Sequence, residues 1–201
     1  METNATVEKL RGKILDRSAR IAIVGVGYVG LPLGVNFAEA GYFVEGFDVN
    51  QEAVVKLNTG KSTIKDIPSE RLRPLVTSGK FRASCDEAIL DHADVIFICV
   101  PTPLTRNKTP DLSYIVKASE TIANHLKPGQ LIVLESTTYP GTTVEIVKPC
   151  LDSRGFTEGT DYFLVFSPER VNPGDEVYSI KNTPKVIGGC SEISTDLCCR
   201  L

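Results

Sequence analysis

The stretch 21–48 places the strongest constraint on the fold, because it reads as a strand, a glycine turn, a helix and a second strand. Residues 21–24 (IAIV) form a short apolar run without alternation, which is typical of a strand buried on both faces of a parallel sheet. The sequence GVGYVG follows at 25–30 without a break. This order of elements predicts the opening half of a dinucleotide-binding fold.

Each glycine of this motif has its own expected role. Gly25 makes the tight turn, Gly27 lets a pyrophosphate approach the backbone, and Gly30 lets the following helix pack closely on the strand. The pyrophosphate would then meet free backbone N–H groups and the positive end of the helix. The motif is weak evidence alone, since a chain with 16 glycines in 201 residues can contain it in a loop by chance.

The segment after the motif strengthens this interpretation. Val29, Leu33 and Phe37 recur at four-residue spacing, which predicts a helix that stops at Gly41. A strand is expected to follow at 42–47. The continuation therefore supplies the strand, helix and strand in which a glycine motif of this kind binds dinucleotides.

Asp48 stands at the tip of the second expected strand, 18 residues after Gly30. An acid at this position accepts hydrogen bonds from the adenine ribose hydroxyls and repels a 2′-phosphate, which favours NAD over NADP. The alternative is that Asp48 only caps the helix expected to begin near Asn50. The spacing of roughly 20 residues favours the cofactor role.

Helices and strands continue to alternate along the rest of the chain. Further helices are expected at 51–58, 70–76 and 86–90, from an Asp111 cap to a stop at 127–129, from a Thr142 or Thr143 cap to about 151, and from Ser191 onward. Further strands are expected at 81–84, 95–100, 131–134, 162–166 and 185–189. This alternation predicts an α/β fold with a doubly wound, mostly parallel sheet, a Rossmann fold.

The length of 201 residues fits one medium-sized domain. Residues 1–20 are expected to form an amino-terminal helical extension, either on the surface or packed on the sheet edge. The dinucleotide-binding domain is expected to cover 21–190, and 191–201 should be the start of a helix that is cut short.

Composition excludes several classes of function. A net charge of −3 and a pI near 5.5 give no basic surface, so neither nucleic acid nor an anionic membrane is an expected partner. No apolar run approaches the roughly 18 residues of a membrane span, and residues 1–20 contain no signal-peptide core, so we expect a cytoplasmic protein. The six cysteines lack zinc-type spacing and the two histidines are isolated, so we expect reduced thiols and no metal site.

Polar segments follow three of the expected strands at their carboxyl ends, where ligands bind in open α/β sheets. Thr102 lies in the first of these loops, and Ser136 and Thr137 follow the next strand. After the strand at 162–166, the charged pair Glu169 and Arg170 stands between two prolines. Such a pair is unusual for a plain turn, and a structural ion pair is the alternative interpretation.

Three groups of motifs stand in order along the chain. They are GVGYVGLPLG at 25–34, CVPTPLT at 99–105 with ESTTYPGTT at 135–143, and FSPERVNPG at 166–174. Together they resemble the UDP-glucose/GDP-mannose dehydrogenase family over almost the whole chain. The form SPERVNPG is more similar to the UDP-N-acetylglucosamine and UDP-N-acetylmannosamine 6-dehydrogenases than to the UDP-glucose enzymes, where the corresponding segment is NPEFLxEG.

This resemblance implies an enzyme that oxidises the C6 alcohol of a UDP-sugar to a carboxylate with two NAD, through an aldehyde and a cysteine-bound thioester. It implies NAD contacts at Gly25, Val26, Gly27, Tyr28, Val29, Gly30, Asp48, Val100, Thr102, Ser136 and Thr137. The implied catalytic residues are Thr137, which helps hold a water, and Glu169, which acts on it as general base or electrostatic partner. The implied UDP-sugar contacts are Glu169, Arg170, Val171 and Asn172.

Three departures from the family pattern limit this comparison. Ala53 stands where many members have a basic residue, and Pro173 replaces the second glutamate of NPEFLxEG. The family also continues with a long central dimerisation helix and a second domain with the nucleophilic cysteine, and neither is found in these 201 residues. We therefore expect the NAD-binding domain alone, inactive by itself, within a full-length protein that forms a homo-oligomer.

Several alternatives stay open at this stage. The substrate of the whole enzyme can be either N-acetylated UDP-sugar or UDP-glucose. A β-hydroxyacid dehydrogenase of the 6-phosphogluconate type would share the fold, but it would not require SPERVNPG. A stand-alone NAD-binding module without chemistry is the alternative from a different class.

Overall fold

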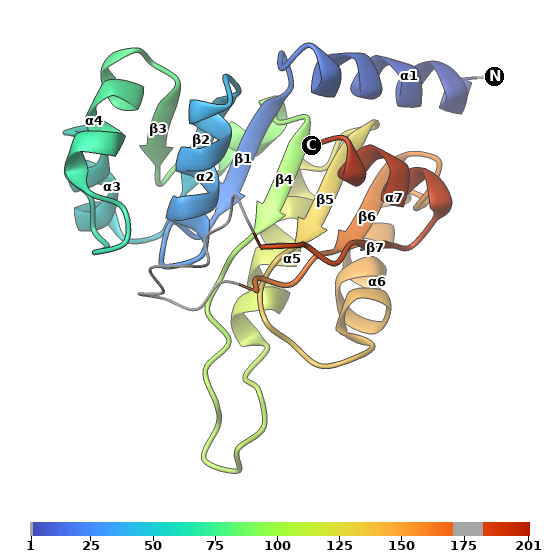
Figure 1. Cartoon of the computed structure of the whole chain (residues 1–201). Helices are drawn as coiled ribbons and strands as arrows, with labels where there is room; N and C mark the ends of the chain where they lie inside the picture. The colour runs from blue at the N-terminus through green and yellow to red at the C-terminus, as the bar shows by residue number, and fades with distance from the viewer. Residues whose placement is uncertain (1, 171–182) are drawn as a thin grey trace.

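The computed structural model describes residues 2–170 and 183–201. Within these residues the fold is built on a seven-stranded sheet with the order β3-β2-β1-β4-β5-β6-β7 (Figure 1). The strands are β1 (Arg20–Val24), β2 (Phe43–Phe47), β3 (Phe81–Ser84), β4 (Val95–Ile98), β5 (Gln130–Leu134), β6 (Tyr162–Phe166) and β7 (Gly188–Gly189). β1 to β6 pair in parallel, and β7 pairs antiparallel with β6. The predicted doubly wound α/β fold is confirmed.

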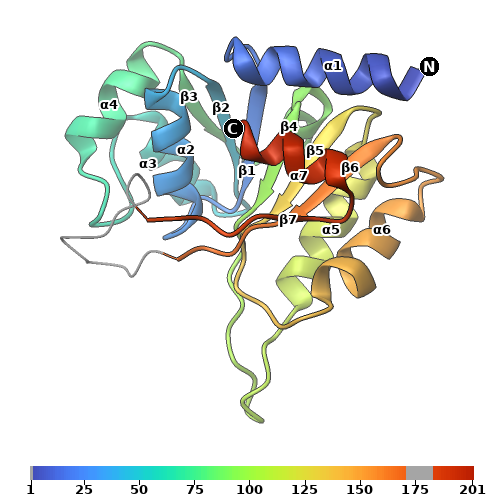
Figure 2. The same ribbon diagram turned by 45° about the vertical axis from the view of Figure 1, so that its right-hand side comes forward.

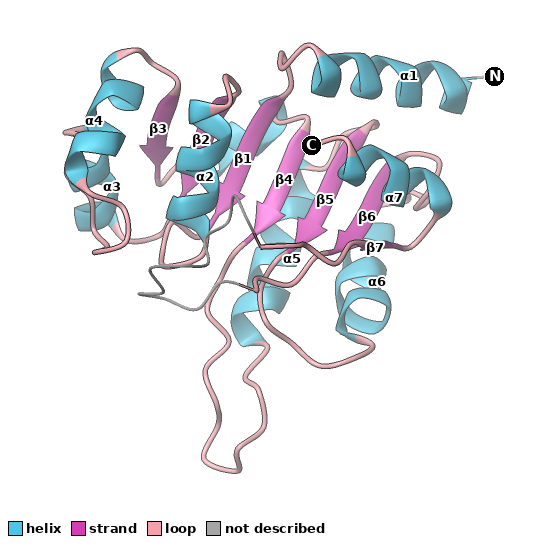
Figure 3. Ribbon diagram, viewed as in Figure 1, coloured by secondary structure: helices cyan, strands magenta, loops and turns pink. Residues whose placement is uncertain are grey.

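Helices cover both faces of the sheet (Figure 3). The α-helices are α1 (Glu2–Leu15), α2 (Gly30–Glu39), α3 (Gln51–Asn58), α4 (Ser69–Thr77), α5 (Ser113–His125), α6 (Lys148–Asp152) and α7 (Glu192–Cys199). The 3₁₀ helix η1 (Glu87–His92) and the π-helical turn η2 (Thr143–Val147) complete the described helices.

The core has two layers, because successive strand side chains point to opposite faces. Ile21 and Ile23 of β1 pack in the layer under α1 to α4 and α7, whereas Ala22 and Val24 pack in the layer under η1, α5 and α6. All residues of β4 and β5 are buried. Their unbroken apolar runs are therefore explained by burial on both faces.

Helix α1 has a more specific position than the surface or the sheet edge expected for residues 1–20. It lies across the amino ends of the central strands, with one face buried and the other exposed (Figures 1 and 2). Val7, Leu10 and Ile14 are buried in the core, and the Lys13 Nζ lies 2.6 Å from the Asp94 carboxylate just before β4. The apolar stripe of α1 therefore closes the amino end of the sheet.

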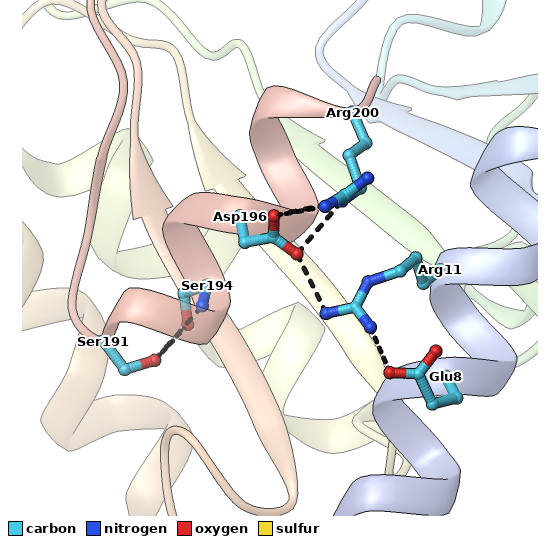
Figure 4. A network of polar contacts seen from close by, with 6 residues as sticks. All are labelled: Glu8, Arg11, Ser191, Ser194, Asp196 and Arg200. Carbon is cyan, nitrogen blue, oxygen red and sulfur yellow. Dashed lines mark hydrogen bonds and ion pairs between the residues drawn. The ribbon is translucent and has the colours of Figure 1, made fainter.

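Helix α7 packs beside α1 and is joined to it by charges. The Asp196 carboxylate accepts from the Arg11 guanidinium at 2.9 Å and pairs with Arg200 at 2.8 Å, so it stands between the two arginines (Figure 4). Arg11 also pairs with Glu8. Ser191 caps α7 by accepting from the Ser194 N–H, as expected of a helix that opens at this serine.

Two expected strands are shorter than predicted. The run at 95–100 leaves the sheet after Ile98, because prolines at 101 and 103 follow and cannot donate to a ladder. The run at 185–189 contributes only Gly188–Gly189.

Two expected helix caps differ from the prediction. Asp111 accepts from the Ser113 N–H at 2.9 Å, but Leu112 occupies the N-cap position of α5. Thr142 does occupy the N-cap position of η2, but its hydroxyl donates to the Tyr139 carbonyl at 3.0 Å and makes no cap hydrogen bond. These polar side chains close the turns that precede the helices. No helix in the described part of the chain is long and apolar enough to cross a bilayer.

Candidate functional site

The carboxyl ends of the parallel strands meet along one end of the sheet, which lies below the strands in Figure 1. The glycine loop leaves β1 there, Asp48 follows β2, and the loops after β4, β5 and β6 leave the same end. We call this side the carboxyl end of the sheet, and the opposite side the amino end. Ligands of open α/β sheets bind at the carboxyl end.

The glycine loop has the geometry that its sequence predicts. Gly25 has a φ of 93°, its N–H donates to the Phe47 carbonyl at 2.8 Å, and an added Cβ would lie 2.8 Å from the Cys99 carbonyl oxygen. An added Cβ on Gly30 would lie 1.9 Å from the Gly25 carbonyl oxygen. Only glycine therefore allows this turn and this approach of α2 to β1.

The start of α2 is shaped for a negatively charged ligand. Val29 occupies the N-cap position, so its apolar side chain cannot accept from the first N–H groups of the helix. The first turn contains no acidic residue. A Cβ on Gly27 would meet no atom within 4 Å, which leaves open space beside the loop. These features fit a pyrophosphate against the backbone.

Asp48 joins the tip of β2 to the glycine loop. Its Oδ2 accepts from the Val26 N–H at 3.0 Å, and its Oδ1 accepts from the Asn50 N–H at 2.9 Å. The N-cap of α3 is Asn50 itself, whose side chain accepts from the Ala53 N–H at 3.1 Å. Asp48 is therefore not the helix cap of the alternative interpretation, and each of its oxygens keeps acceptor capacity for a ribose hydroxyl.

A cavity of about 520 Å³ opens beside this loop. Six of the residues predicted to contact NAD line it: Gly25, Gly27, Tyr28, Val29, Asp48 and Val100. Val26 is buried and donates its N–H to Asp48, and Gly30 is buried as the first residue of α2. Thr102, Ser136 and Thr137 lie at the carboxyl end of the sheet but are not among the residues that line this cavity.

The far wall of the cavity was not predicted. It contains Glu87 of η1 and Tyr114, Lys117 and Thr121 of α5. The three α5 residues recur at helical spacing beside the predicted buried stripe, at the start of a helix that follows a ligand-side loop. That spacing is a signal that could have identified them.

The loops after β4 and β5 are held together by Ser136. Its buried hydroxyl lies 2.7 Å from the Val100 carbonyl oxygen and 3.2 Å from the Ile98 carbonyl oxygen. Thr137, the next residue, is exposed, and Thr102 is half-buried. Ser136 therefore positions the two loops that carry these threonines.

Glu169 lies at the exit of β6, on the same end of the sheet as the glycine loop. Its backbone N–H donates to the Glu135 carbonyl at 3.3 Å, and its Oε1 accepts from the Arg170 N–H at 2.7 Å. The Arg170 side chain is exposed. Val171 and Asn172, the other predicted sugar contacts, lie outside the described residues.

The buried Glu135 forms an ion pair with the half-buried Lys185 that the sequence did not predict. The Lys185 Nζ lies 2.6 Å from both carboxylate oxygens of Glu135. Burial raises the pKa of Glu135 to about 7, although Lys185 lowers it and Glu169 adds to the rise. Glu135 directly follows a buried strand, which places it among the ligand-side residues, but no pattern connects it to a lysine 50 positions later.

Burial favours the neutral form of four of the thiols. Burial raises the pKa of Cys99 and Cys150, that of Cys190 to about 11, and that of Cys198 to about 12. Cys99 differs from the expectation of a thiol inside the strand, because it follows β4 and also lines the cavity. Among the described residues, no group of three or more metal-binding side chains comes together.

The fold, the glycine loop and the acid at the tip of β2 together define an NAD-binding domain of the Rossmann type. Residues 19–201 match the NAD binding domain of the UDP-glucose/GDP-mannose dehydrogenase family, and the chain belongs to this family. The resemblance predicted from the motifs and NAD as the cofactor are both confirmed.

Relatives with N-acetylated sugar substrates in their names are similar to most of the chain. A UDP-N-acetyl-D-mannosamine dehydrogenase of Pyrococcus horikoshii is 37% identical over 179 residues, which cover 89% of this chain and 43% of that protein. A UDP-N-acetyl-D-glucosamine 6-dehydrogenase of Salmonella typhi is 39% identical over 171 residues, which cover 85% of this chain and 39% of that protein.

A solved structure shows the same arrangement. The crystal structure of an NDP-N-acetyl-D-galactosaminuronic acid dehydrogenase from Methanosarcina mazei Go1 is similar with a TM-score of 0.87 and 32% identity. The alignment covers 97% of this chain and 43% of that one. The chain therefore spans less than half the length of these relatives.

Proposed function

We propose that the chain is the NAD-binding part of a UDP-sugar 6-dehydrogenase, which oxidises the C6 alcohol of a UDP-N-acetylhexosamine to a carboxylate with two NAD. The observation that carries this proposal is that the NAD cavity and Glu169 share the carboxyl end of one sheet. The sequence SPERVNPG and the substrates in the names of the two sequence relatives favour an N-acetylated sugar over UDP-glucose.

In this proposal the glycine loop and the start of α2 bind the pyrophosphate, and Asp48 accepts from the adenine ribose. NAD supplies the acceptor for the hydride that leaves the sugar carbon. Thr137 holds a water near that carbon, and Glu169 takes a proton from this water or stabilises its charge. Arg170, together with Val171 and Asn172, contacts the UDP-sugar.

The nucleophilic thiolate of the reaction is proposed to lie outside these 201 residues. A nucleophilic cysteine needs a lowered pKa and access to the substrate. Burial raises the pKa of Cys99, Cys150, Cys190 and Cys198 instead. The chain alone should therefore bind NAD without turnover, and the whole protein should form a homo-oligomer through a segment beyond this domain.

The test compares the chain alone with a chimera in which it replaces the matching part of the Pyrococcus horikoshii relative. NADH formation is measured with UDP-N-acetylmannosamine, UDP-N-acetylglucosamine and UDP-glucose. The chimera should oxidise an N-acetylated sugar, and Glu169→Gln should reduce kcat by at least about 100-fold, whereas Glu120→Gln on the exposed face of α5 should not.

Two results would contradict the proposal. A chimera that folds and binds NAD but oxidises none of the three sugars would favour an NAD-binding module without this chemistry. Turnover by the chain alone that disappears in one cysteine-to-serine variant would place the nucleophile within these residues.

A further inference from the structure

Three charged side chains come together at the carboxyl end of the sheet from distant parts of the chain. Glu135 follows β5, Glu169 follows β6, and Lys185 precedes β7. The Lys185 Nζ lies 2.6 Å from both Glu135 oxygens and 3.9 Å from the Glu169 Oε2. The exposed fractions of these side chains are 2% for Glu135, 10% for Glu169 and 24% for Lys185.

The pairing is unequal, and this inequality indicates a division of roles. Glu135 is the deepest of the three groups and holds the ammonium with both oxygens, so it fixes where the lysine charge lies. An ammonium has three N–H donors, and this arrangement leaves one of them for another acceptor. The nearest oxygen of Glu169 stands at the distance of a longer ion pair. The lysine charge therefore acts on both carboxylates but is anchored by one.

The backbone reinforces this connection between the two glutamates. The Glu169 N–H donates to the Glu135 carbonyl at 3.3 Å, next to the pairing of β5 with β6. A displacement of Glu135 would therefore affect Glu169 through this backbone hydrogen bond as well as through Lys185.

Among residues 2–170 and 183–201, two thiols are the other titratable groups that interact with Glu135 from neighbouring elements. Cys99 reaches it from the exit of β4, and Cys198 reaches it from α7. Burial raises the pKa of both thiols, so they carry no charge near neutral pH. The charge of the cluster near neutral pH is thus governed by Glu135, Glu169 and Lys185.

We propose that Lys185 is a positioning residue for Glu169, and that the buried Glu135 carboxylate holds Lys185 in place for this task. The proposal rests on the proposed function, in which Glu169 acts on the reacting water. Because one ammonium serves two carboxylates, the protonation of Glu135 changes how much of the lysine charge acts on Glu169. Glu135 has a pKa of about 7, so this change falls in the neutral range.

The coupling can be measured without substrate or cofactor. The 201-residue chain is labelled with [5-¹³C]glutamate, and the carboxyl signals of Glu135 and Glu169 are assigned with Glu135→Gln and Glu169→Gln. In the wild type, the Glu169 signal should shift in a step near pH 7 together with the titration of Glu135. Glu135→Gln should abolish this step.

Two lysine variants separate positioning from simple support of the fold. Lys185→Met should reduce the step in the Glu169 signal to the part that direct repulsion between the two carboxylates produces, and it should move the midpoint of Glu135 upward, because the cation that lowers its pKa is gone. Lys185→Arg keeps the charge and should restore the step. Amide spectra and thermal unfolding report whether each variant is folded. If Lys185→Met does not fold, the presence of the step in Lys185→Arg and its absence in Glu135→Gln still test the proposal.

A Glu169 signal without a step near pH 7 in the wild type would overturn the proposal. A step that persists unchanged in folded Lys185→Met would overturn it equally. Because the measurement uses neither NAD nor a UDP-sugar, a failed turnover assay leaves this result intact, and the two proposals can fail separately.

Discussion

The two ends of the sheet use the same kinds of interaction for different purposes. At the amino end, α1 closes the core with apolar side chains, and its charges meet those of α7, which covers the face of the sheet over β5 and β6 (Figures 2 and 4). At the carboxyl end, loops surround a cavity. The buried carboxylate of Glu135 pairs there with the half-buried Lys185. One end is therefore built mainly for stability, and the other holds the groups available for chemistry.

This comparison teaches that the value of an ion pair depends on where it lies. A pair in water adds little, since solvent screens both charges and the side chains lose freedom to form it. A buried charge that loses its partner is strongly disfavoured, because it stays removed from water. Arg11 and Asp196, with side chains 26% and 37% exposed, are closer to the first case, and Glu135, which is 2% exposed, represents the second.

The largest expected effect on stability is at the amino end. Ile14 is 1% exposed in the core, so Ile14→Ala should lower the free energy of unfolding by about 3 kcal/mol. Its neighbour Leu15 is 62% exposed, and Leu15→Ala should change the free energy little. Urea unfolding measures both, and calorimetry should find NAD affinity unchanged in Ile14→Ala. A clear loss of affinity would show that the two ends are not independent.

The next effect depends on pH and belongs to the carboxyl end. The pKa of Glu135 is raised from 4.5 to about 7 in the folded chain, so protons bind the folded state more tightly. Protonation of Glu135 therefore stabilises the folded state by roughly 3 kcal/mol below about pH 4.5, and this stabilisation is lost as the pH rises through 7. The stability of wild type relative to Glu135→Gln should therefore fall between pH 5 and pH 8. Urea unfolding of both proteins at pH 5 and at pH 8 measures this difference. A relative stability that rises with pH would contradict the prediction.

A smaller effect concerns cofactor choice. The chain should bind NAD more tightly than NADP, because the Asp48 carboxylate repels a 2′-phosphate. Asp48→Ala removes a charged acceptor and should weaken NAD binding by about tenfold, which narrows this preference. Calorimetric titration with both cofactors checks this, with Asp66→Ala on the exposed surface as the control. Equal affinity of wild type for both cofactors would contradict the proposed role of Asp48.

The smallest effect is expected where the contacts are most visible in Figure 4. Arg11→Ala removes the guanidinium that joins α1 to Asp196 of α7, but solvent reaches this pair. The urea midpoint should stay within experimental error of the wild type. A midpoint that falls as far as that of Ile14→Ala would show that the ion pair, and not the apolar stripe, holds α1 in place.

Elements with a local signal could be predicted closely from the sequence. Gln51–Asn58, Phe81–Ser84 and Tyr162–Phe166 were expected at the residues where they occur, because each is bounded by turn residues or caps and carries a clear pattern. The glycine loop was also predictable, since its turn requires a positive φ at Gly25. Such features depend on neighbours in the chain.

Features set by tertiary contacts were missed. The pair of Glu135 with Lys185 exists because β5, β6 and β7 are adjacent in the sheet, which no local pattern states. The position of α1 likewise depends on apolar packing in the core layer that it shares with α7, nearly the whole chain away. The cavity wall from α5 could have been found by helical spacing, but only once the direction of the sheet was known.

The hydrogen bonds of Asp48 have a consequence for how a cofactor is received. The carboxylate already accepts from Val26 in the glycine loop and from Asn50 at the start of α3, so its rotamer is fixed before any ligand arrives. Preorganisation of this kind lowers the entropy lost on association, because the ribose meets an acceptor that need not be ordered. The same carboxylate therefore belongs both to the scaffold of the loop and to the ligand.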